Sequence, residues 1–367
     1  MNEEDRLRAH LASILPADRN AMEQAKERQA QLAKPPGSLG ELEQIGIRLA
    51  GITGKINNHV SRTRIYVLAA DNGVCAEGIS SAPQSVTTAQ SVNLTRGLTG
   101  AGVLARHFGD ELTVVDVGIA AEYDCPAIVN RRIAYGTKNF AKEPAMTRRQ
   151  AVKAIVTGID LAAQAKKDGV SCLGVGEMGI GNTTTSAAVL AVLTGKTALD
   201  VTGRGGGIED AAFARKKAII DGAIARFSPD PGDPVDVLSK VGGFDLCAMT
   251  GVFLGAAECR IPAVIDGFIS AVAALCAVRL CENAGVTMFP SHDSYERGYR
   301  VAVEALGLQP WLNLGMRLGE GSGCPLAFRV IEAACAVMNE MATFSEAGID
   351  DGYLAPIRKN DSFTVRE

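Results

Sequence analysis

One candidate for chemistry in this chain is a glutamate held between glycines. In the segment 314–323, Glu320 has a glycine on each side and lies three residues after Arg317. Glycine removes the side-chain bulk that would keep a ligand away from the backbone. A carboxylate in such a segment can serve as a general base. The alternative is a surface turn with a solvated glutamate, and this segment alone does not decide between the two.

A second glycine-rich segment is typical of an anion-binding loop. Residues 176–185 read Gly-Glu-Met-Gly-Ile-Gly-Asn-Thr-Thr-Thr, between a predicted strand and a predicted helix. Free N–H groups and the helix dipole bind phosphate in that setting. No Gly-Lys-Ser/Thr follows, and no G-x-G-x-x-G is in register with a strand, so neither a P-loop nor a dinucleotide fingerprint is present. We predict an anion site here, with a tight structural turn as the alternative.

A third segment strengthens the case for a phosphate-bearing substrate. Gly203-Arg204-Gly205-Gly206-Gly207 precedes a predicted helix that carries Lys216 and Lys217. Taken alone this segment is weak, because glycine runs often serve only as loops. Glu209 and Asp210 suit the helix N-terminus, where negative charge is favourable. Two anion loops in one chain together favour a substrate with a phosphate group.

The remaining candidates are weaker. His292 follows a predicted strand and is either catalytic or, as we favour, a hydrogen-bonded loop histidine. The other histidines are scattered, so we expect no metal cluster. Neither a G-x-S-x-G elbow nor a Cys/His pairing indicates covalent catalysis. Some aspartates lie in or after strands and glycine turns, where they either bind substrate or cap turns: Asp71, Asp116 and Asp245.

Composition excludes several classes of protein. The chain has 367 residues, 47% of them hydrophobic and 21% charged, with a net charge of −4. That charge gives no basic surface for nucleic acid or an anionic membrane. The nine cysteines contain no CxxC pair, which favours a reducing cytoplasm. The apolar run 268–278 is too short to span a bilayer, and the charged N-terminus is not a signal peptide.

The elements that must position these residues alternate along the chain. Buried-strand patterns alternate with helical patterns, which predicts an α/β fold: a Rossmann-like, mainly parallel sheet flanked by helices. The polar segments then lie at the carboxyl ends of strands, where open sheets bind ligands. Residues 1–33 form a predicted helix outside this alternation. We predict a smaller helical domain from residues 1–60 plus about 326–367, and a large domain from 61–325. The predicted strands are 64–70, 112–118, 169–175, 260–265 and 285–289, and the main predicted helices are 147–167, 186–195, 209–227, 243–257, 267–283 and 326–343.

Four motifs, in this order, resemble the nicotinate-nucleotide:dimethylbenzimidazole phosphoribosyltransferase family. They are Lys34-Pro35-Pro36-Gly37-Ser38-Leu39-Gly40, Ala70-Asp71-Asn72-Gly73-Val74, the segment 176–184 and the segment 314–321. The resemblance runs nearly end to end. It implies a homodimer that transfers 5-phosphoribosyl from nicotinate mononucleotide to 5,6-dimethylbenzimidazole or a related base, without a cofactor or metal. The products would be α-ribazole 5′-phosphate and nicotinate.

The resemblance also implies roles for individual residues. By position, Glu320 matches the catalytic base and Glu177 a supporting acid. Gln90 and the loop around Ala82 match contacts to the acceptor base. Other residues fall where the family holds the phosphoribosyl and nicotinate groups, or beside them: Gly179, Gly181, Asn182, Thr183, Gly205, Lys216, Ser294, Arg317 and Leu318.

The chain departs from the family pattern at a few positions, and two other functions stay open. Ala82 replaces the serine of some members, the run 205–207 lacks a central threonine, and Ser294-Tyr295-Glu296 replaces smaller residues. These departures affect the choice of base. The alternatives are a Mg²⁺-dependent phosphoribosyltransferase that releases pyrophosphate, with Glu209 and Asp210 as its acidic pair, and a non-catalytic nucleotide- or base-binding protein.

Overall fold

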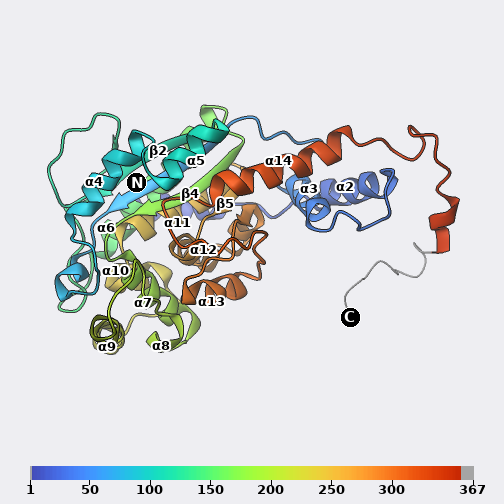
Figure 1. The fold of residues 1–367 in the computed structure, drawn as a ribbon. Helices are drawn as coiled ribbons and strands as arrows, with labels where there is room; N and C mark the ends of the chain where they lie inside the picture. Colours follow the sequence, from blue (N-terminus) through green and yellow to red (C-terminus); the bar gives the residue numbers. More distant parts are fainter. Residues whose placement is uncertain (1, 357–367) are drawn as a thin grey trace. The chain divides into compact units, whose positions relative to one another are not determined.

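The computed structural model describes residues 2–356, which divide into two compact units. Unit 1 comprises residues 2–15 and 62–327, and unit 2 comprises residues 16–61 and 328–356. Figure 1 shows the elements of both units, coloured along the chain.

Unit 1 is built on a six-stranded sheet with the order β3-β2-β1-β4-β5-β6. Every adjacent pair is parallel, which confirms the predicted Rossmann-like sheet. In this order the chain reverses its direction of winding between β1 and β4, where the sheet opens a crevice for ligands. The short strand β3 was not predicted. The strands are β1 (Thr63–Ala70), β2 (Glu111–Gly118), β3 (Val129–Asn130), β4 (Cys172–Met178), β5 (Ala263–Ile265) and β6 (Met288–Pro290).

The register of the central strands sets which residues end next to each other. Leu68 of β1 pairs with Glu177 of β4, and Val175 of β4 pairs with Ile265 of β5. The predicted strand 169–175 therefore begins three residues later, at Cys172, and extends through Glu177 to Met178. Because parallel strands end at one edge, Glu177 and the residue after Ile265 are brought together there.

Helices cover both faces of this sheet. α4 (Ser85–Thr95) and α5 (Gly100–Phe108) lie above it in Figure 1, whereas α11 (Phe244–Glu258) and α12 (Phe268–Leu280) lie below. α6 (Arg148–Lys167) packs on α11. The remaining elements of unit 1 are α1 (Glu3–Ser13), η1 (Gly73–Glu77), α7 (Asn182–Thr194), α8 (Ala198–Val201), α9 (Asp210–Phe227), α10 (Pro234–Val241), η2 (Glu282–Thr287) and α13 (Arg297–Leu306).

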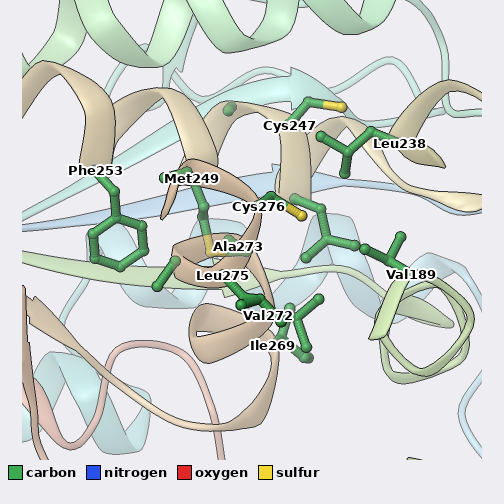
Figure 2. Close-up of a cluster of buried hydrophobic side chains, with 14 of the residues drawn as sticks. Val189, Leu238, Cys247, Met249, Phe253, Ile269, Val272, Ala273, Leu275 and Cys276 are labelled. Atoms are coloured by element: carbon green, nitrogen blue, oxygen red, sulfur yellow. The ribbon is translucent and has the colours of Figure 1, made fainter. Parts of the chain in front are cut away.

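The core of unit 1 lies between the sheet and the helices of the lower face. α11 and α12 are buried over nearly all their length, which explains their uniformly apolar sequences. Gly158 of α6 and Gly251 of α11 have no room for a Cβ, because the two backbones touch there. Figure 2 shows part of this core, with side chains from α7, α10, α11 and α12: Val189, Leu238, Cys247, Met249, Phe253, Ile269, Val272, Ala273, Leu275 and Cys276.

Unit 2 is helical. α2 (Arg19–Gln31) and α3 (Glu41–Thr53) pack together, and α14 (Cys324–Glu340) enters the unit at residue 328. A small apolar cluster joins the helices through Ala25, Ile47 and Met338, among others. Between α2 and α3, the buried ammonium of Lys34 pairs with Glu43 at 2.7 Å. The lysine of the Lys-Pro-Pro-Gly motif therefore makes an ion pair within unit 2.

The predicted helix 1–33 is wrong as a single element. α1 ends at Ser13 and α2 begins at Arg19, with Pro16 between them. α1 belongs to unit 1 because Leu7 and Ile14 join its core and His10 contacts Glu258 of α11. Residues 2–15 therefore lie outside the unit in which we expected them. The division into a small helical domain and a large domain stays a prediction.

Candidate functional site

A cavity of about 330 Å³ lies in unit 1 at the carboxyl ends of β4 and β5. Its size is within the range of small-molecule sites. Loops that follow strands form most of the wall, as expected for an open parallel sheet. The lining residues are Ser80, Ser81, Ala82, Val86, Gln90, 177–183, Gly205, Gly206, 266–270, Ser294, Glu296 and 317–320.

The predicted site residues converge on this cavity. Glu320 and Glu177, predicted as base and supporting acid, both line it. Lys216 is the exception, because it lies behind the wall and reaches the cavity through Thr183. The predicted substrate-binding residues that line the cavity are Ala82, Gln90, Gly179, Gly181, Asn182, Thr183, Gly205, Ser294, Arg317 and Leu318.

Glu320 is buried and has a strained backbone. It is 5% exposed, with φ at 61°, in the left-handed region that L-residues avoid. Gly319 and Gly321 are left-handed too, at 81° and 83°, so three consecutive residues form one unusual turn. The alternative of a solvated surface glutamate is therefore wrong.

Two hydrogen bonds orient the Glu320 carboxylate. Gln90 of α4 donates from Nε2 to Oε1 at 3.1 Å, and the N–H of Ala101 at the start of α5 lies 3.4 Å from Oε2. Asn93 donates to the amide oxygen of Gln90 at 3.1 Å, which fixes which end of that amide faces Glu320. A carboxylate that is positioned and only partly solvated can accept a proton from a bound ligand.

The glycine-rich segment after β4 provides positive charge and N–H donors, in contrast to the carboxylate of Glu320. α7 begins at Asn182, four residues earlier than predicted, so the helix N-terminus opens directly into the cavity. Gly181 has φ of 95°, which the tight turn from strand to helix requires. The positive end of the helix dipole and a cluster of small side chains suit an anion such as phosphate.

Lys216 of α9 supplies a cation behind this turn. Its Nζ donates to Thr183 Oγ1 at 2.8 Å and to the carbonyl oxygen of Gly203 at 3.4 Å. Burial lowers the pKa of Lys216 from 10.5 to about 8, although the nearby Glu296 carboxylate opposes that change. A bound anion would stabilise the protonated ammonium and so raise this pKa again.

Buried carboxyls surround the floor of the cavity. Glu177 accepts a hydrogen bond from the side chain of Asn182, which also donates to Asp245 at 3.1 Å. Burial raises the pKa of Glu177 to about 8, that of Asp245 to about 6 and that of Asp266 to about 7. Negative charge on Asp245 and Asp266 adds to the increase at Glu177. At neutral pH this floor therefore holds part of its protons.

Asp266 was not among the site residues predicted from the sequence. It follows β5 directly, lines the cavity and accepts hydrogen bonds from the N–H groups of Gly321 and Gly323. The signal was present, because a polar residue after a buried strand was the reason for considering Asp71. Glu296 was noted only as a departure, yet it also lines the cavity.

Other candidates lie elsewhere. His292 is buried, hydrogen-bonded to Ser291 at 3.0 Å and stacked on Tyr299, and burial lowers its pKa. It does not line the cavity, which agrees with the favoured interpretation of a loop histidine. Asp71 and Asp116 accept backbone N–H groups near the ends of β1 and β2, so both serve as turn residues.

The acidic pair required by the pyrophosphate-releasing alternative is not in the cavity. Glu209 is the N-cap residue of α9, and Asp210 forms an ion pair with Arg204. Within residues 2–356, no group of three or more histidine, cysteine or acidic side chains is arranged to hold a metal ion. In that same range, no helix is long and apolar enough to cross a membrane.

Arg317 has an exposed guanidinium at the cavity. Within the part of the chain that the structure describes, its side chain makes no hydrogen bond or ion pair. It lies close enough to Glu296 to lower the pKa of that carboxyl, although burial has the larger and opposite effect. It therefore does not brace the 314–323 segment and remains available to a ligand.

Comparisons with known proteins identify the family. A family model described as "Phosphoribosyltransferase" matches residues 14–349. A nicotinate-nucleotide–dimethylbenzimidazole phosphoribosyltransferase of Clostridium perfringens is 51% identical over 97% of this chain and 98% of its own length. One of Geobacter metallireducens is 47% identical over 93% and 97%.

A solved structure agrees with the sequence comparisons. The crystal structure of the enzyme of that name from Thermus thermophilus superposes with a TM-score of 0.86 at 39% identity, covering 91% of this chain and 100% of that one. The order of the strands and the cavity at their carboxyl ends lead to the same assignment as these matches. This chain belongs to the nicotinate-nucleotide–dimethylbenzimidazole phosphoribosyltransferase family of enzymes.

Proposed function

We propose that this enzyme transfers 5-phosphoribosyl from nicotinate mononucleotide to 5,6-dimethylbenzimidazole or a related base. The products are α-ribazole 5′-phosphate and nicotinate. One observation carries the proposal: a single cavity contains both an oriented, buried carboxylate, Glu320, and the N-terminus of α7 backed by Lys216. The names of the relatives supply the substrates that fit these two subsites.

The chemistry needs few protein groups. The bond from C1′ of the ribosyl group to the pyridinium nitrogen breaks, and its electron pair neutralises that nitrogen, so the leaving group needs no general acid. A ring nitrogen of the acceptor supplies the electron pair of the new bond to C1′. The proton on the other ring nitrogen passes to Glu320, which keeps the product neutral at the base. A placed general base contributes roughly 10²–10⁴-fold, and holding both substrates in line adds to this.

The remaining cavity residues suit the other groups of the substrates. The α7 N-terminus, Thr183 and Lys216 would hold the phosphate, and Arg317 would contact the nicotinate carboxylate or the phosphate. Ala82, Gln90 and Leu318 would form the slot for the flat acceptor. Glu177 would support Glu320 by accepting its backbone N–H, at 3.4 Å. Alanine at position 82 removes a hydroxyl, which favours a slot that recognises shape over hydrogen bonding.

The test is turnover of nicotinate mononucleotide with a panel of benzimidazoles, purines and phenols, followed by nicotinate release. We expect release with a benzimidazole and retained activity after complete chelation. Loss of activity on chelation would favour the pyrophosphate-releasing alternative. If no base gives release while the nucleotide still binds, the chain is a binding protein and the proposed reaction is wrong.

We also propose a homodimer. The family resemblance implies it, and three leucines are exposed: Leu98 by 65%, Leu314 by 58% and Leu318, which lines the cavity, by 57%. Light scattering after size-exclusion chromatography should give twice the mass of the chain. A monomer at working concentrations would exclude this assembly.

We further propose that the enzyme works in the reducing cytoplasm. All nine cysteines are free thiols, and five of them are buried. Thiol titration of the protein purified without reductant should recover nine thiols after denaturation, whereas disulfides would argue for another compartment.

A further inference from the structure

The turn that carries Glu320 is left-handed at three successive residues, a conformation that needs external support. A left-handed conformation is unfavourable for an L-residue, and such strain persists only where neighbouring groups impose it. Successive N–H groups in a turn of this kind point to one side and form a concave anion site, called a nest. Here the anion is part of the protein.

Asp266 occupies this nest with both carboxylate oxygens. The N–H of Gly321 donates to Oδ2 at 3.0 Å, and the N–H of Gly323 donates to Oδ1 at 2.7 Å. Asp266 is 2% exposed and is part of no ion pair within residues 2–356. Its strongest partners are therefore the backbone donors on either side of Ser322, immediately after Glu320.

Asp266 is itself fixed from two sides. Its N–H donates to Ser270 Oγ at 3.2 Å, and Ser270 donates to the carbonyl oxygen of Val175 in β4 at 2.8 Å. Its carbonyl oxygen accepts from Ser291 Oγ at 2.7 Å. The backbone of Asp266 is thus anchored through Ser270 to β4 and through Ser291 to the segment after β6, and its carboxylate links these elements to the turn.

We infer that Asp266 is the positioning residue for the catalytic base: it holds the left-handed turn so that the Glu320 carboxylate meets the acceptor N–H. This inference rests on the proposed function. It predicts that Asp266 affects the rate of the chemical step and does not affect the affinity for nicotinate mononucleotide. Misplacing a reacting group by about 1 Å can cost on the order of 10²-fold in rate.

The decisive variant is Asp266→Asn. The amide offers one acceptor oxygen, and its NH₂ group faces a backbone N–H, so one support of the turn is lost. We expect kcat for nicotinate release to fall about 10²-fold, with unchanged affinity for nicotinate mononucleotide measured by titration. In the Glu320→Gln background the same change should have little further effect, because a residue that acts through Glu320 has nothing left to position.

Asp116→Asn is the matched control. Asp116 is also a buried aspartate that accepts two backbone N–H groups, at 2.9 and 2.8 Å, but it does not line the cavity. It should affect stability and leave kcat unchanged. If Asp266→Asn does not fold, Ser291→Ala removes the hydrogen bond to the backbone carbonyl of Asp266, and we expect a smaller fall in kcat that also disappears in the Glu320→Gln background.

The outcomes separate the two hypotheses. An inactive wild type with every base refutes the proposed function itself. An active wild type with equal losses from Asp266→Asn in both backgrounds overturns the positioning role, as does a loss confined to nucleotide affinity. Where only Ser291→Ala folds, an unchanged kcat overturns it.

Discussion

At the residue scale, the site contains a buried carboxylate, Glu320, and a buried ammonium group, Lys216. Glu320 is held by α4 and α5, whereas Lys216 reaches Thr183 from α9. The two side chains are hydrogen-bonded to different elements, so each is available to a different part of the substrates. Changes at the two residues should therefore have different kinetic signatures.

Glu320→Gln should lower kcat by roughly 10²–10⁴-fold, since the amide cannot take the acceptor proton. Nicotinate mononucleotide should still bind, because in the proposed function its phosphate is held at the N-terminus of α7 and not by Glu320. Nicotinate release and equilibrium titration check the two statements. The control is Glu304→Gln on the exposed side of α13, which should behave as the wild type. A variant with full turnover would contradict the role of Glu320.

Lys216→Met should raise KM for nicotinate mononucleotide by about 10–100-fold at neutral pH, because a charge-assisted hydrogen bond is lost. The pKa of Lys216 is lowered to about 8, so its charge is present below that pH and is lost above it. The wild-type KM should therefore rise as pH increases above about 8, and this rise should be absent in the variant. Lys217→Met, on the same helix and packed on Phe213, is the control. An equal pH dependence in both variants would exclude Lys216 as its source.

At the element scale, the turn 319–323 rests directly on the sheet. A Cβ at Gly176 of β4 would lie 2.5 Å from the nitrogen of Gly321, and one at Gly321 would lie 2.7 Å from Ile65 of β1. These glycines are required by close approach, and the contact aligns the turn with the strand ends. The N-terminus of α7 is positioned by the same strand, because β4 leads directly into it.

Gly176→Ala should therefore displace the turn, lower stability by about 1–3 kcal/mol through overpacking, and lower kcat more than it changes nucleotide affinity. Denaturant unfolding and steady-state kinetics provide the measurements. In contrast, Gly222→Ala in α9 meets no atom within 4 Å, and it should stabilise by up to about 1 kcal/mol. Wild-type kinetics in Gly176→Ala would show that the turn does not depend on this contact.

At the scale of the whole molecule, the buried carboxyls link stability to pH. Folding raises the pKa of Glu177 from 4.5 to about 8 and that of Asp266 from 3.8 to about 7. Between these limits the unfolded chain has lost protons that the folded chain keeps, so the folded state is progressively disfavoured as pH rises. The stabilisation from these two carboxyls is fully present below the pKa values of the unfolded chain. It is lost as pH rises through the pKa values of the folded protein.

Glu177→Gln should consequently become more stable relative to the wild type as pH rises from about 5 to about 8. Urea unfolding at a series of pH values gives the difference directly. The Glu304→Gln variant should follow the wild type throughout. A difference that does not change with pH would mean that Glu177 is ionised in the folded protein over this range.

Much of this arrangement was determined by the sequence. Alternating buried-strand and helical patterns predicted the parallel sheet, because a strand covered on both faces must be apolar throughout. Glycines next to Glu320 and Asn182 marked the loops that approach a ligand, and the ordered motifs identified the family. These features are local, because each is determined by residues that are close together in the sequence.

Only the tertiary structure decided which of the site residues contact one another. Asp266 meets the Glu320 turn because β5 ends next to β4, and the strand order that places them together is absent from the local pattern. The same holds for Lys216, which is buried behind Thr183 by the packing of α9 on α7. At the left-handed Glu320 turn, the N–H groups of Glu320 and Gly321 likewise donate to carboxyls from distant segments, Glu177 and Asp266. Long-range contacts determined how the site is held, whereas the sequence determined which residues it contains.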